Sequence, residues 1–301
     1  MNNSKFFIFL YICAIFISGE FLQSCTKELD EPLQSITETI NGFEVEWRTQ
    51  ITVEQKNTIT EILNDMVAVE GDFFVMGATP EQAEMARPNE YPNAYVYLSD
   101  YHIGGHEVND AQYNAIMGAA KTSSERYPSN ISLSEWTLFV DVLKDLTGLN
   151  FNFPSEAQWE YAARGGKHSK GYIYPGSDTL EDVRSTSIIN GSQVPNELGL
   201  CNLADLKSEW CLDFYNDLVS GSILTDWIQL NGEYRVVRGG NYLCTATTNS
   251  YYPNNSSDLC YRLAYGTTAV NKEQDYRQCR ISSRSYSYKG NSYIGCRLVI
   301  N

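Results

Sequence analysis

The feature that most constrains the fold of this chain is a short helix between residues 154 and 166, because both of its ends are encoded in the sequence. Ser155 is placed to cap the first turn, and Gln158, three residues later, can reach back to complete a capping box. Gly165 and Gly166 end the helix, since glycine enters the left-handed conformation without a Cβ clash. A helix this short is marginal in water on its own. We therefore expect it to be buried by the rest of the chain.

The N-terminal residues have the pattern of an export signal. The apolar run from Phe6 to Ile17 is too short to span a bilayer, which needs roughly 20 residues, and it matches the hydrophobic region of a secretory signal. The run ends at Leu22-Gln23-Ser24-Cys25, which resembles a bacterial lipobox, where cleavage leaves a lipid on Cys25. An ordinary secretory signal with a chance cysteine is the alternative. Because several acyl chains anchor a protein stably, we expect a lipid-anchored protein of the bacterial cell envelope, at the outer membrane or the cell surface.

The charge of the chain excludes one class of partner. The formal net charge is −15, and removal of residues 1–24 takes away Lys5 and Glu20 and leaves that charge unchanged. A chain this acidic is repelled by phosphate backbones, so we expect no nucleic acid partner. A basic partner, a cation and solubility alone stay open as reasons for the acidity.

Composition and periodicity divide the chain into four parts. Residues 1–24 are the signal, and residues 25–50 are polar and acidic, which favours a tether. Residues 51–65 form a lead-in helix, in which Thr52 and Gln55 make a capping box. Residues 66–301 form one domain, with no internal repeat in the sequence. Its first two apolar runs, on either side of Gly71-Asp72, predict a β-hairpin.

The predicted secondary structure changes character along the domain. Strands are expected at residues 94–98 and 101–108, and helices begin at the capping residues Asn109 and Ser132. After residue 166 helical periodicity disappears, and glycine, asparagine, serine and tyrosine dominate. Helices early in the chain and irregular β structure late in it predict an α+β fold.

Six segments, in one order, carry a resemblance to a known family. They are residues 69–77 (VEGDFFVMG), 101–108 (YHIGGHEV), 153–166 (FPSEAQWEYAARGG), 199–211 (GLCNLADLKSEWC), 235–242 (RVVRGGNY) and 280–298. The chain resembles the formylglycine-generating enzyme family, also called the sulfatase-modifying factor family, from about Met66 to its C-terminus. The resemblance implies a C-type-lectin-like α+β fold with short helices and irregular β structure.

The resemblance also implies an activity. The family oxidises a cysteine of a client sulfatase to formylglycine with molecular oxygen and copper, which two cysteines hold. Aligning on Arg280 and Arg284 places those two positions at Tyr276 and Ile281, neither of which ligates Cu(I), and the nearby Cys279 is a single thiolate. We therefore expect copper and the oxidase activity to be absent. An oxidoreductase that modifies a client sulfatase cysteine or a related side chain through other ligands is the alternative.

A calcium site is the second property that the family implies. In the family, an asparagine and a glutamate in the segment matching residues 199–211 lie where calcium binds. Here Leu206 replaces the asparagine and offers only its carbonyl, while Glu209 is kept. Calcium takes six to eight oxygen ligands, and Asp205 could compensate. The sequence leaves a calcium site open, with Glu209 as the ligand to test.

The cysteines suggest disulfides. Of the eight, Cys13 lies in the signal and Cys25 at the lipidation position, which leaves an even number in an exported protein. The remaining six are Cys201, Cys211, Cys244, Cys260, Cys279 and Cys296. Sequence alone does not resolve their pairing. We predict Cys244–Cys260, Cys211–Cys279 and Cys201–Cys296.

Tyrosines near the C-terminus form the candidate ligand surface. They are Tyr251, Tyr252, Tyr261, Tyr265 and Tyr276. Aromatic rings over a groove stack on sugars or clasp an extended peptide, whereas packing of the irregular half of the fold is the simpler role. We expect a non-catalytic module that binds a peptide, a protein or a glycan.

Overall fold

Helix α4 (Glu156–Ala163) is the helix expected between residues 154 and 166, and all eight of its residues are buried in the computed structural model. Its capping box is formed. Gln158 N donates to Ser155 Oγ at 3.1 Å, and Ser155 N donates to Gln158 Oε1 at 2.9 Å. Gly165, with a φ of 91°, ends the helix in the left-handed conformation. The prediction of this helix and of both its ends is confirmed.

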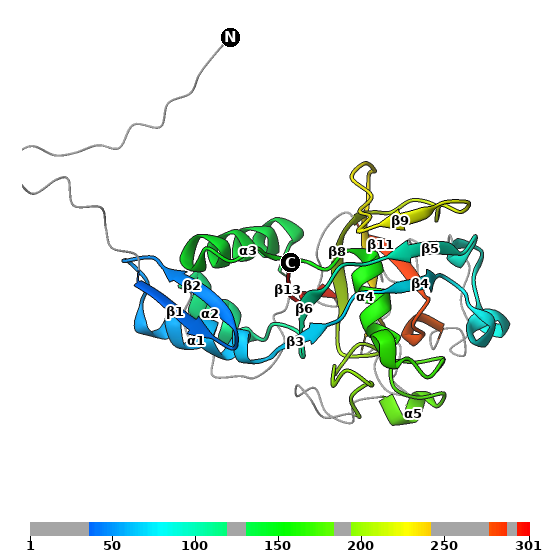
Figure 1. Cartoon of the computed structure of the whole chain (residues 1–301), viewed down its shortest axis with the longest axis horizontal. Coiled ribbons are helices and arrows are strands. Elements are labelled where there is room, and N and C mark those ends of the chain that lie inside the picture. Colours follow the sequence, from blue (N-terminus) through cyan, green and yellow to red (C-terminus); the bar gives the residue numbers. More distant parts are fainter. Residues whose placement is uncertain (1–35, 119–130, 184–193, 242–276, 288–293) are drawn as a thin grey trace, which may run out of the picture. The chain divides into compact units, whose positions relative to one another are not determined.

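The structure describes residues 36–118, 131–183, 194–241, 277–287 and 294–301, and residues 36–301 form one compact unit. The other helices of this described part are α1 (Val53–Asn64), α2 (Asp110–Met117), α3 (Leu133–Thr147) and the single turn α5 (Leu180–Val183). Each of α1, α2 and α3 begins with a capping box, at Thr52, Asn109 and Ser132 as predicted. Helix α2 lies against both α1 and α3 (Figure 1).

The strands of the described residues form two larger and two smaller sheets. One larger sheet has the order β3 (Met66–Val69), β6 (Tyr101–Gly104), β13 (Val299–Ile300) and β7 (Phe151–Asn152). The other has the order β11 (Arg284–Ser287), β10 (Arg235–Arg238), β8 (Ser208–Phe214) and β12 (Ile294–Gly295). The smaller sheets are β4 (Phe73–Met76), β5 (Ala94–Tyr97) and β9 (Ile223–Thr225), in that order, and the pair β1 (Ile36–Ile40) and β2 (Phe43–Trp47).

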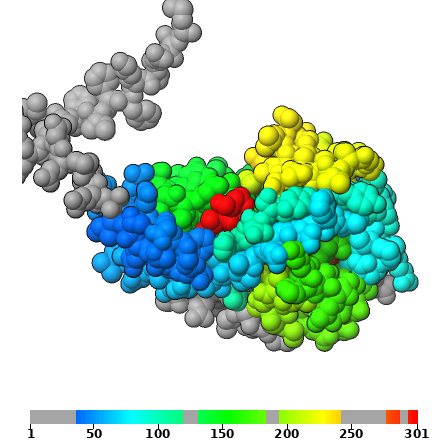
Figure 2. Space-filling view, in the orientation of Figure 1, coloured from blue at the N-terminus to red at the C-terminus, as the bar shows by residue number. Residues whose placement is uncertain are grey.

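Pairing in these sheets joins distant parts of the sequence. The C-terminal strand β13 lies between β6 and β7. In Figure 2 these last residues, coloured red, reach the surface between the green helices and the cyan strands. Helix α4 contacts β4, β8 and β10, so it holds strands of two different sheets together. Within the described residues, no helix combines the length and the apolar character that crossing a membrane requires.

The structure contradicts two predictions about the N-terminal strands. A tether was predicted over residues 25–50, and in the described part, from residue 36 onward, β1 and β2 instead form a hairpin that buries Phe43, Val45 and Trp47 in the core with α1 and α3. The turn is Asn41-Gly42, whose φ angles of 47° and 85° are those that a tight hairpin favours. The hairpin predicted around Gly71-Asp72 is also absent. Strand β3 pairs with β6 and β4 pairs with β5, so the two runs enter different sheets.

Candidate functional site

The position that the family resemblance assigns to copper is part of the core. Ile281 is 2% exposed in the hydrophobic cluster that contains α4, and Cys279 is fully buried in a separate cluster. Tyr276 lies outside the described residues. An aliphatic side chain and one buried thiol do not supply the paired thiolates that Cu(I) takes. The residues present at Ile281 and Cys279 therefore do not fit the copper of the family.

Arginines of the family motifs lie inside the fold and pair with the carboxylates of α4. Arg284 Nε and Nη2 donate to the two carboxylate oxygens of Glu156 at 2.6 and 2.7 Å. Arg238 Nε lies 3.0 Å from the same carboxylate, and its Nη2 pairs with Glu160. Burial raises the pKa of Glu156, but Arg284 and Arg238 outweigh burial and leave that pKa below its usual value. These guanidinium groups hold the scaffold together.

The carboxylate of Glu209 is occupied by side-chain hydrogen-bond donors, one of which is an arginine. Its carboxylate accepts hydrogen bonds from Arg297 at 2.7 to 3.0 Å and from Trp159 Nε1 at 2.7 Å. Next to it, the ammonium of Lys207 interacts with Glu107. In the described ranges, no group of three or more histidines, cysteines or acidic residues is arranged to hold a metal ion. The structure does not support Glu209 as a calcium ligand.

The described cysteines are free thiols, so the predicted disulfides Cys211–Cys279 and Cys201–Cys296 are wrong. Three of these cysteines lie in three different hydrophobic clusters, each filling its own part of the core. These three are Cys211, Cys279 and Cys296. Cys244 and Cys260, the third predicted pair, lie outside the described residues.

Other predicted site residues also fall outside the described ranges. They are the lipidation residue Cys25 and the candidate ligand surface of Tyr251, Tyr252, Tyr261, Tyr265 and Tyr276. The structure therefore directs attention to a different place for ligand binding.

A groove follows the outer edge of β4. Three successive residues, Phe73, Phe74 and Val75, line one side of a pocket of about 620 Å³. Strand β4 is at the edge of its described sheet, and the hydrogen bond from Leu98 N to Asp72 O fixes its antiparallel register. In this register the backbone groups of Phe74 face β5, whereas those of Phe73 and Val75 face the groove. Phe73 N donates to Asp72 Oδ1 at 2.8 Å, but in the described part of the chain the Val75 N–H and C=O have no partner.

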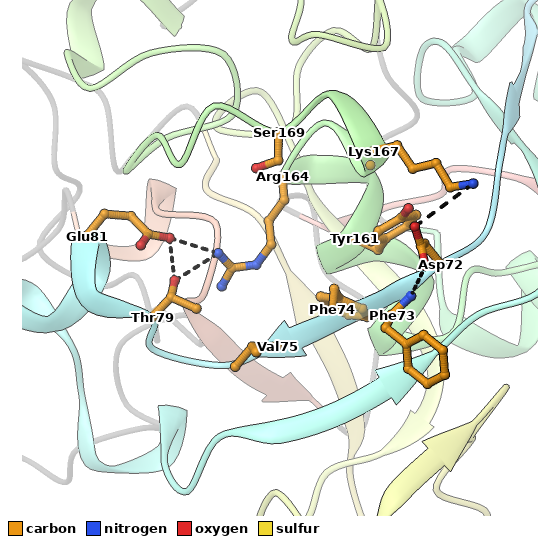
Figure 3. A pocket seen from close by; sticks show the side chains of 11 residues that line it. Asp72, Phe73, Phe74, Val75, Thr79, Glu81, Tyr161, Arg164, Lys167 and Ser169 are labelled. Atoms are coloured by element: carbon orange, nitrogen blue, oxygen red, sulfur yellow. Dashed lines mark hydrogen bonds and ion pairs between the residues drawn. The ribbon is translucent and has the colours of Figure 1, made fainter.

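The opposite wall comes from the C-terminal end of α4 and the turn that follows it, as Figure 3 shows. Arg164 Nη1 donates to Thr79 Oγ1 at 2.9 Å and to Glu81 Oε1 at 3.0 Å. Its Nη2 donates to Gly77 O and to Glu160 Oε1, both at 2.7 Å, and its Nε donates to Glu160 at 3.0 Å. Every N–H of the guanidinium is thus used within the protein. Arg164 shapes the groove, and it does not offer free donors for an anion.

Lys167 lies at the end of the groove opposite Glu81 (Figure 3). Its ammonium forms an ion pair with Glu70 and lies 3.9 Å from Asp72 Oδ2. The hydrogen bond with Glu70 raises the pKa of Lys167. Burial, followed by the charges of Asp72 and Glu70, raises the pKa of Tyr161 to about 12, so its hydroxyl stays protonated. The groove therefore offers aromatic rings, internally paired charges and an open strand edge.

The sequence interpretation missed this groove because it paired β4 with β3. The available signal was the Phe73-Phe74 pair, since two large rings in succession on a strand place one on each face. Phe73 is 59% exposed and its ring contacts that of Tyr97, with centroids 4.8 Å apart. Phe74 faces inward and contacts Tyr161, with centroids 5.1 Å apart.

Comparison with known proteins agrees with the motifs and the fold. Residues 49–301 match the family model described as a sulfatase-modifying factor enzyme 1-like domain. The chain belongs to this family. Within the family, the formylglycine-generating enzyme of Streptomyces coelicolor is 32% identical over 112 residues, which are 30% of this chain and 36% of that enzyme. This sulfatase-modifying factor domain is therefore aligned with only about a third of the Streptomyces enzyme.

Two other similarities cover more of this sulfatase-modifying factor domain. Chaperone protein LppX of Paenibacillus barcinonensis is 21% identical over 286 residues, covering 73% of this chain and 91% of LppX. The solved structure of Treponema denticola variable protein 1 matches with a TM-score of 0.57 and 18% identity, over 90% of this chain and 99% of that one. At such identity a structural match shows the fold alone. The predicted α+β fold of the formylglycine-generating enzyme type is confirmed.

Proposed function

We propose that this chain is a non-catalytic binding module that takes an extended peptide segment of a partner protein into the groove along β4. The peptide adds a strand to the sheet β4–β5–β9 and pairs with the edge of β4. This mode of recognition draws affinity from main-chain hydrogen bonds and specificity from pockets for alternate side chains.

The open edge at Val75 is the observation that carries the proposal. Its N–H and C=O face the groove, and the described residues give them no partner. Buried or half-buried backbone groups are nearly always paired, so an unpaired pair of groups at an edge is a template for another strand. The aromatic rings of Phe73 and Tyr161 flank this edge and add apolar contact for peptide side chains.

Two further facts support a polypeptide ligand. LppX, which is similar over most of its length, is named a chaperone protein, and a chaperone acts on polypeptides. The charges that line the groove are paired within the protein, but the whole chain carries a net charge of −15. The proposed peptide is therefore neutral or basic.

Substitution of Val75 tests strand addition directly. We expect Val75→Pro to abolish binding, because proline removes the N–H that faces the groove and leaves the β4–β5 ladder intact. Val75→Thr keeps the N–H and is the matched control. Peptides selected from a displayed random library on the full chain would be measured by fluorescence anisotropy against both variants. Equal binding by Val75→Pro and Val75→Thr would contradict strand addition.

We propose that a lipid on Cys25 anchors the module to a bacterial membrane. Its support is the lipobox-like Leu22-Gln23-Ser24-Cys25 after an apolar run. In cell fractionation, Cys25→Ser should move the protein out of the membrane fraction. A variant that stays with the membrane would refute the anchor.

A further inference from the structure

The sheet formed by β4, β5 and β9 buries one face and exposes the other. On the buried face, Met76 and Val96 lie in the same hydrophobic cluster as α4, and the ring of Phe74 contacts that of Tyr161. Side chains alternate between the two faces along a strand, so the intervening residues point outward. The ring of Phe73, for example, points away from Tyr161 (Figure 3). The outward residues, which we call the outer face, are Phe73, Val75, Tyr95, Tyr97, Ile223 and Thr225.

Strand pairing arranges the outer face as two rows that cross the sheet. One row is Phe73, Tyr97 and Thr225. The other row is Val75, Tyr95 and Ile223. Phe73, Tyr95 and Ile223 are 59, 55 and 61% exposed, and the rings of Phe73 and Tyr97 contact each other. Exposed apolar side chains that gather in one patch indicate a binding surface, whereas single ones are common on any protein.

Hydrogen bonds beside this patch hold its shape before any ligand binds. Asp226 N donates to Tyr97 O at 2.9 Å, which continues the parallel pairing of β9 with β5. The Asp226 carboxylate accepts hydrogen bonds from Ser99 N at 2.8 Å and from Ser99 Oγ at 2.7 Å, so both of its oxygens are used within the protein. A surface that is already ordered loses little conformational entropy when it binds a ligand.

Size and charge limit what the outer face can bind. Six residues on three strands cover roughly 200 Å², because strands lie about 4.8 Å apart and each residue adds about 3.3 Å along a strand. A stable interface between two proteins covers about 800 Å² on each partner, so this face is too small to hold a second copy of the chain. None of the six side chains is charged, and the net charge of −15 repels anionic polymers. The ligand that fits is narrow and uncharged.

We propose that the outer face binds an uncharged glycan chain that lies flat across β4, β5 and β9. The C–H groups of a sugar ring carry partial positive charge and pack on the electron-rich face of an aromatic ring. The hydroxyls of Tyr95, Tyr97 and Thr225 form hydrogen bonds with sugar hydroxyls, which a purely aliphatic patch cannot do. Neighbouring side chains of the outer face lie roughly 5 to 7 Å apart, so several of them contact successive sugar units.

This site does not depend on the peptide groove, because the peptide uses the edge of β4 and the glycan uses the face of the sheet. The test is isothermal titration of the full chain with neutral hexasaccharides of β-1,4-glucan, β-1,3-glucan, α-1,6-mannan and β-1,4-linked N-acetylglucosamine. Hexagalacturonate is the anionic probe. We expect at least one neutral hexasaccharide to bind and hexagalacturonate not to bind.

Variants of the central strand β5 identify the site. Tyr95→Ala should weaken binding about tenfold, because it removes a stacking ring, whereas Tyr95→Phe keeps the ring and should retain most of the affinity. Leu138→Ala is the matched control, because Leu138 is 53% exposed but lies on α3, outside the sheet, and this variant should bind like the unmodified chain. Ile223→Asp places a charge on the outer face from β9 and should also weaken binding.

Three results would overturn the proposal. The first is that no neutral hexasaccharide binds the unmodified chain. The second is that folded Tyr95→Ala binds as tightly as Leu138→Ala, which would place the glycan elsewhere. The third is that hexagalacturonate binds more tightly than the neutral probes, which would make charge and not stacking the basis of recognition.

Discussion

At the scale of single residues, the buried ion pair of Arg297 and Glu209 has the most consequences for the fold. Both side chains are fully buried, and the guanidinium donates to both carboxylate oxygens at 2.7 to 3.0 Å. The same arginine donates to Gly104 O at 2.9 Å and to Cys201 O at 2.7 Å. A buried pair of this kind adds little net stability over an apolar pair, but the loss of one member leaves an unpaired buried charge.

Arg297→Met should therefore destabilise the domain by about 3 to 5 kcal/mol, since it strands the Glu209 carboxylate in the core. Glu209→Gln combined with Arg297→Met removes that charge and should recover a large part of the loss. Urea unfolding of both variants gives the comparison. If the double variant is no more stable than Arg297→Met alone, the cost does not come from the stranded carboxylate.

His106 gives the fold a dependence on pH. The hydrogen bond with Asp65 raises its pKa from 6.5 to about 9, so the folded state binds the proton more tightly than the unfolded chain does. The resulting stabilisation is complete below pH 6.5 and is lost as the pH rises through about 9. Because the pair with Asp65 is partly exposed and screened, we expect a contribution of about 1 to 2 kcal/mol.

Denaturant unfolding between pH 6 and pH 10 measures this contribution as the difference between the unmodified chain and His106→Asn. The difference should shrink across that range, because only the unmodified chain loses the ion pair. A difference that stays constant with pH would show that His106 is not coupled to Asp65 in the way the geometry indicates.

At the scale of elements, α4 is the helix for which the sequence-based prediction matches the structure best. Capping residues act locally, so Ser155 and Gln158 could be recognised from their spacing alone. The burial of Glu156 and Glu160 could not, because it depends on Arg238 and Arg284 from distant strands. Local rules predicted where α1 to α4 begin, and only the tertiary structure reveals which charges they bury.

Strand pairing was the harder problem, for a physical reason. The pattern of apolar residues identifies a strand but does not determine which strand it pairs with. The sequence analysis therefore paired β3 with β4, whereas in the structure β3 pairs with β6 and β4 pairs with β5. The β1–β2 hairpin was missed although Asn41-Gly42 is a strong turn signal. The acidic residues Glu44 and Glu46 alternate with its buried ones, and their charge concealed the pattern. The groove depends on the β4 partner, so it was missed too.

Ser155→Ala tests the cap of α4. The variant leaves Gln158 N without its acceptor at the first turn, and we expect a loss of about 1 kcal/mol, up to about 2 because the site is buried. Ser155→Thr keeps the hydroxyl and is the control. Thermal unfolding measures the stability of both variants. Equal stability of Ser155→Ala and Ser155→Thr would mean that the cap contributes nothing.

At the scale of the whole molecule, the scaffold of the sulfatase-modifying factor family is kept, while an aliphatic side chain stands at one of the two positions that the family resemblance assigns to copper. This side chain is Ile281, which is buried in a hydrophobic cluster. The same scaffold exposes the edge of β4 beside α4, where we place the peptide ligand. Fold membership alone therefore does not fix the activity, which depends on particular side chains at the site.

An activity assay tests the central claim, binding without the oxidase reaction, most directly. The full chain is incubated with Cu(I), oxygen and a peptide of the form Cys-x-Pro-x-Arg, and the peptide is followed by mass spectrometry. We predict that the cysteine stays unchanged over the time in which an active formylglycine-generating enzyme, run in parallel, converts it. The appearance of the mass loss that marks formylglycine on that cysteine would contradict the account.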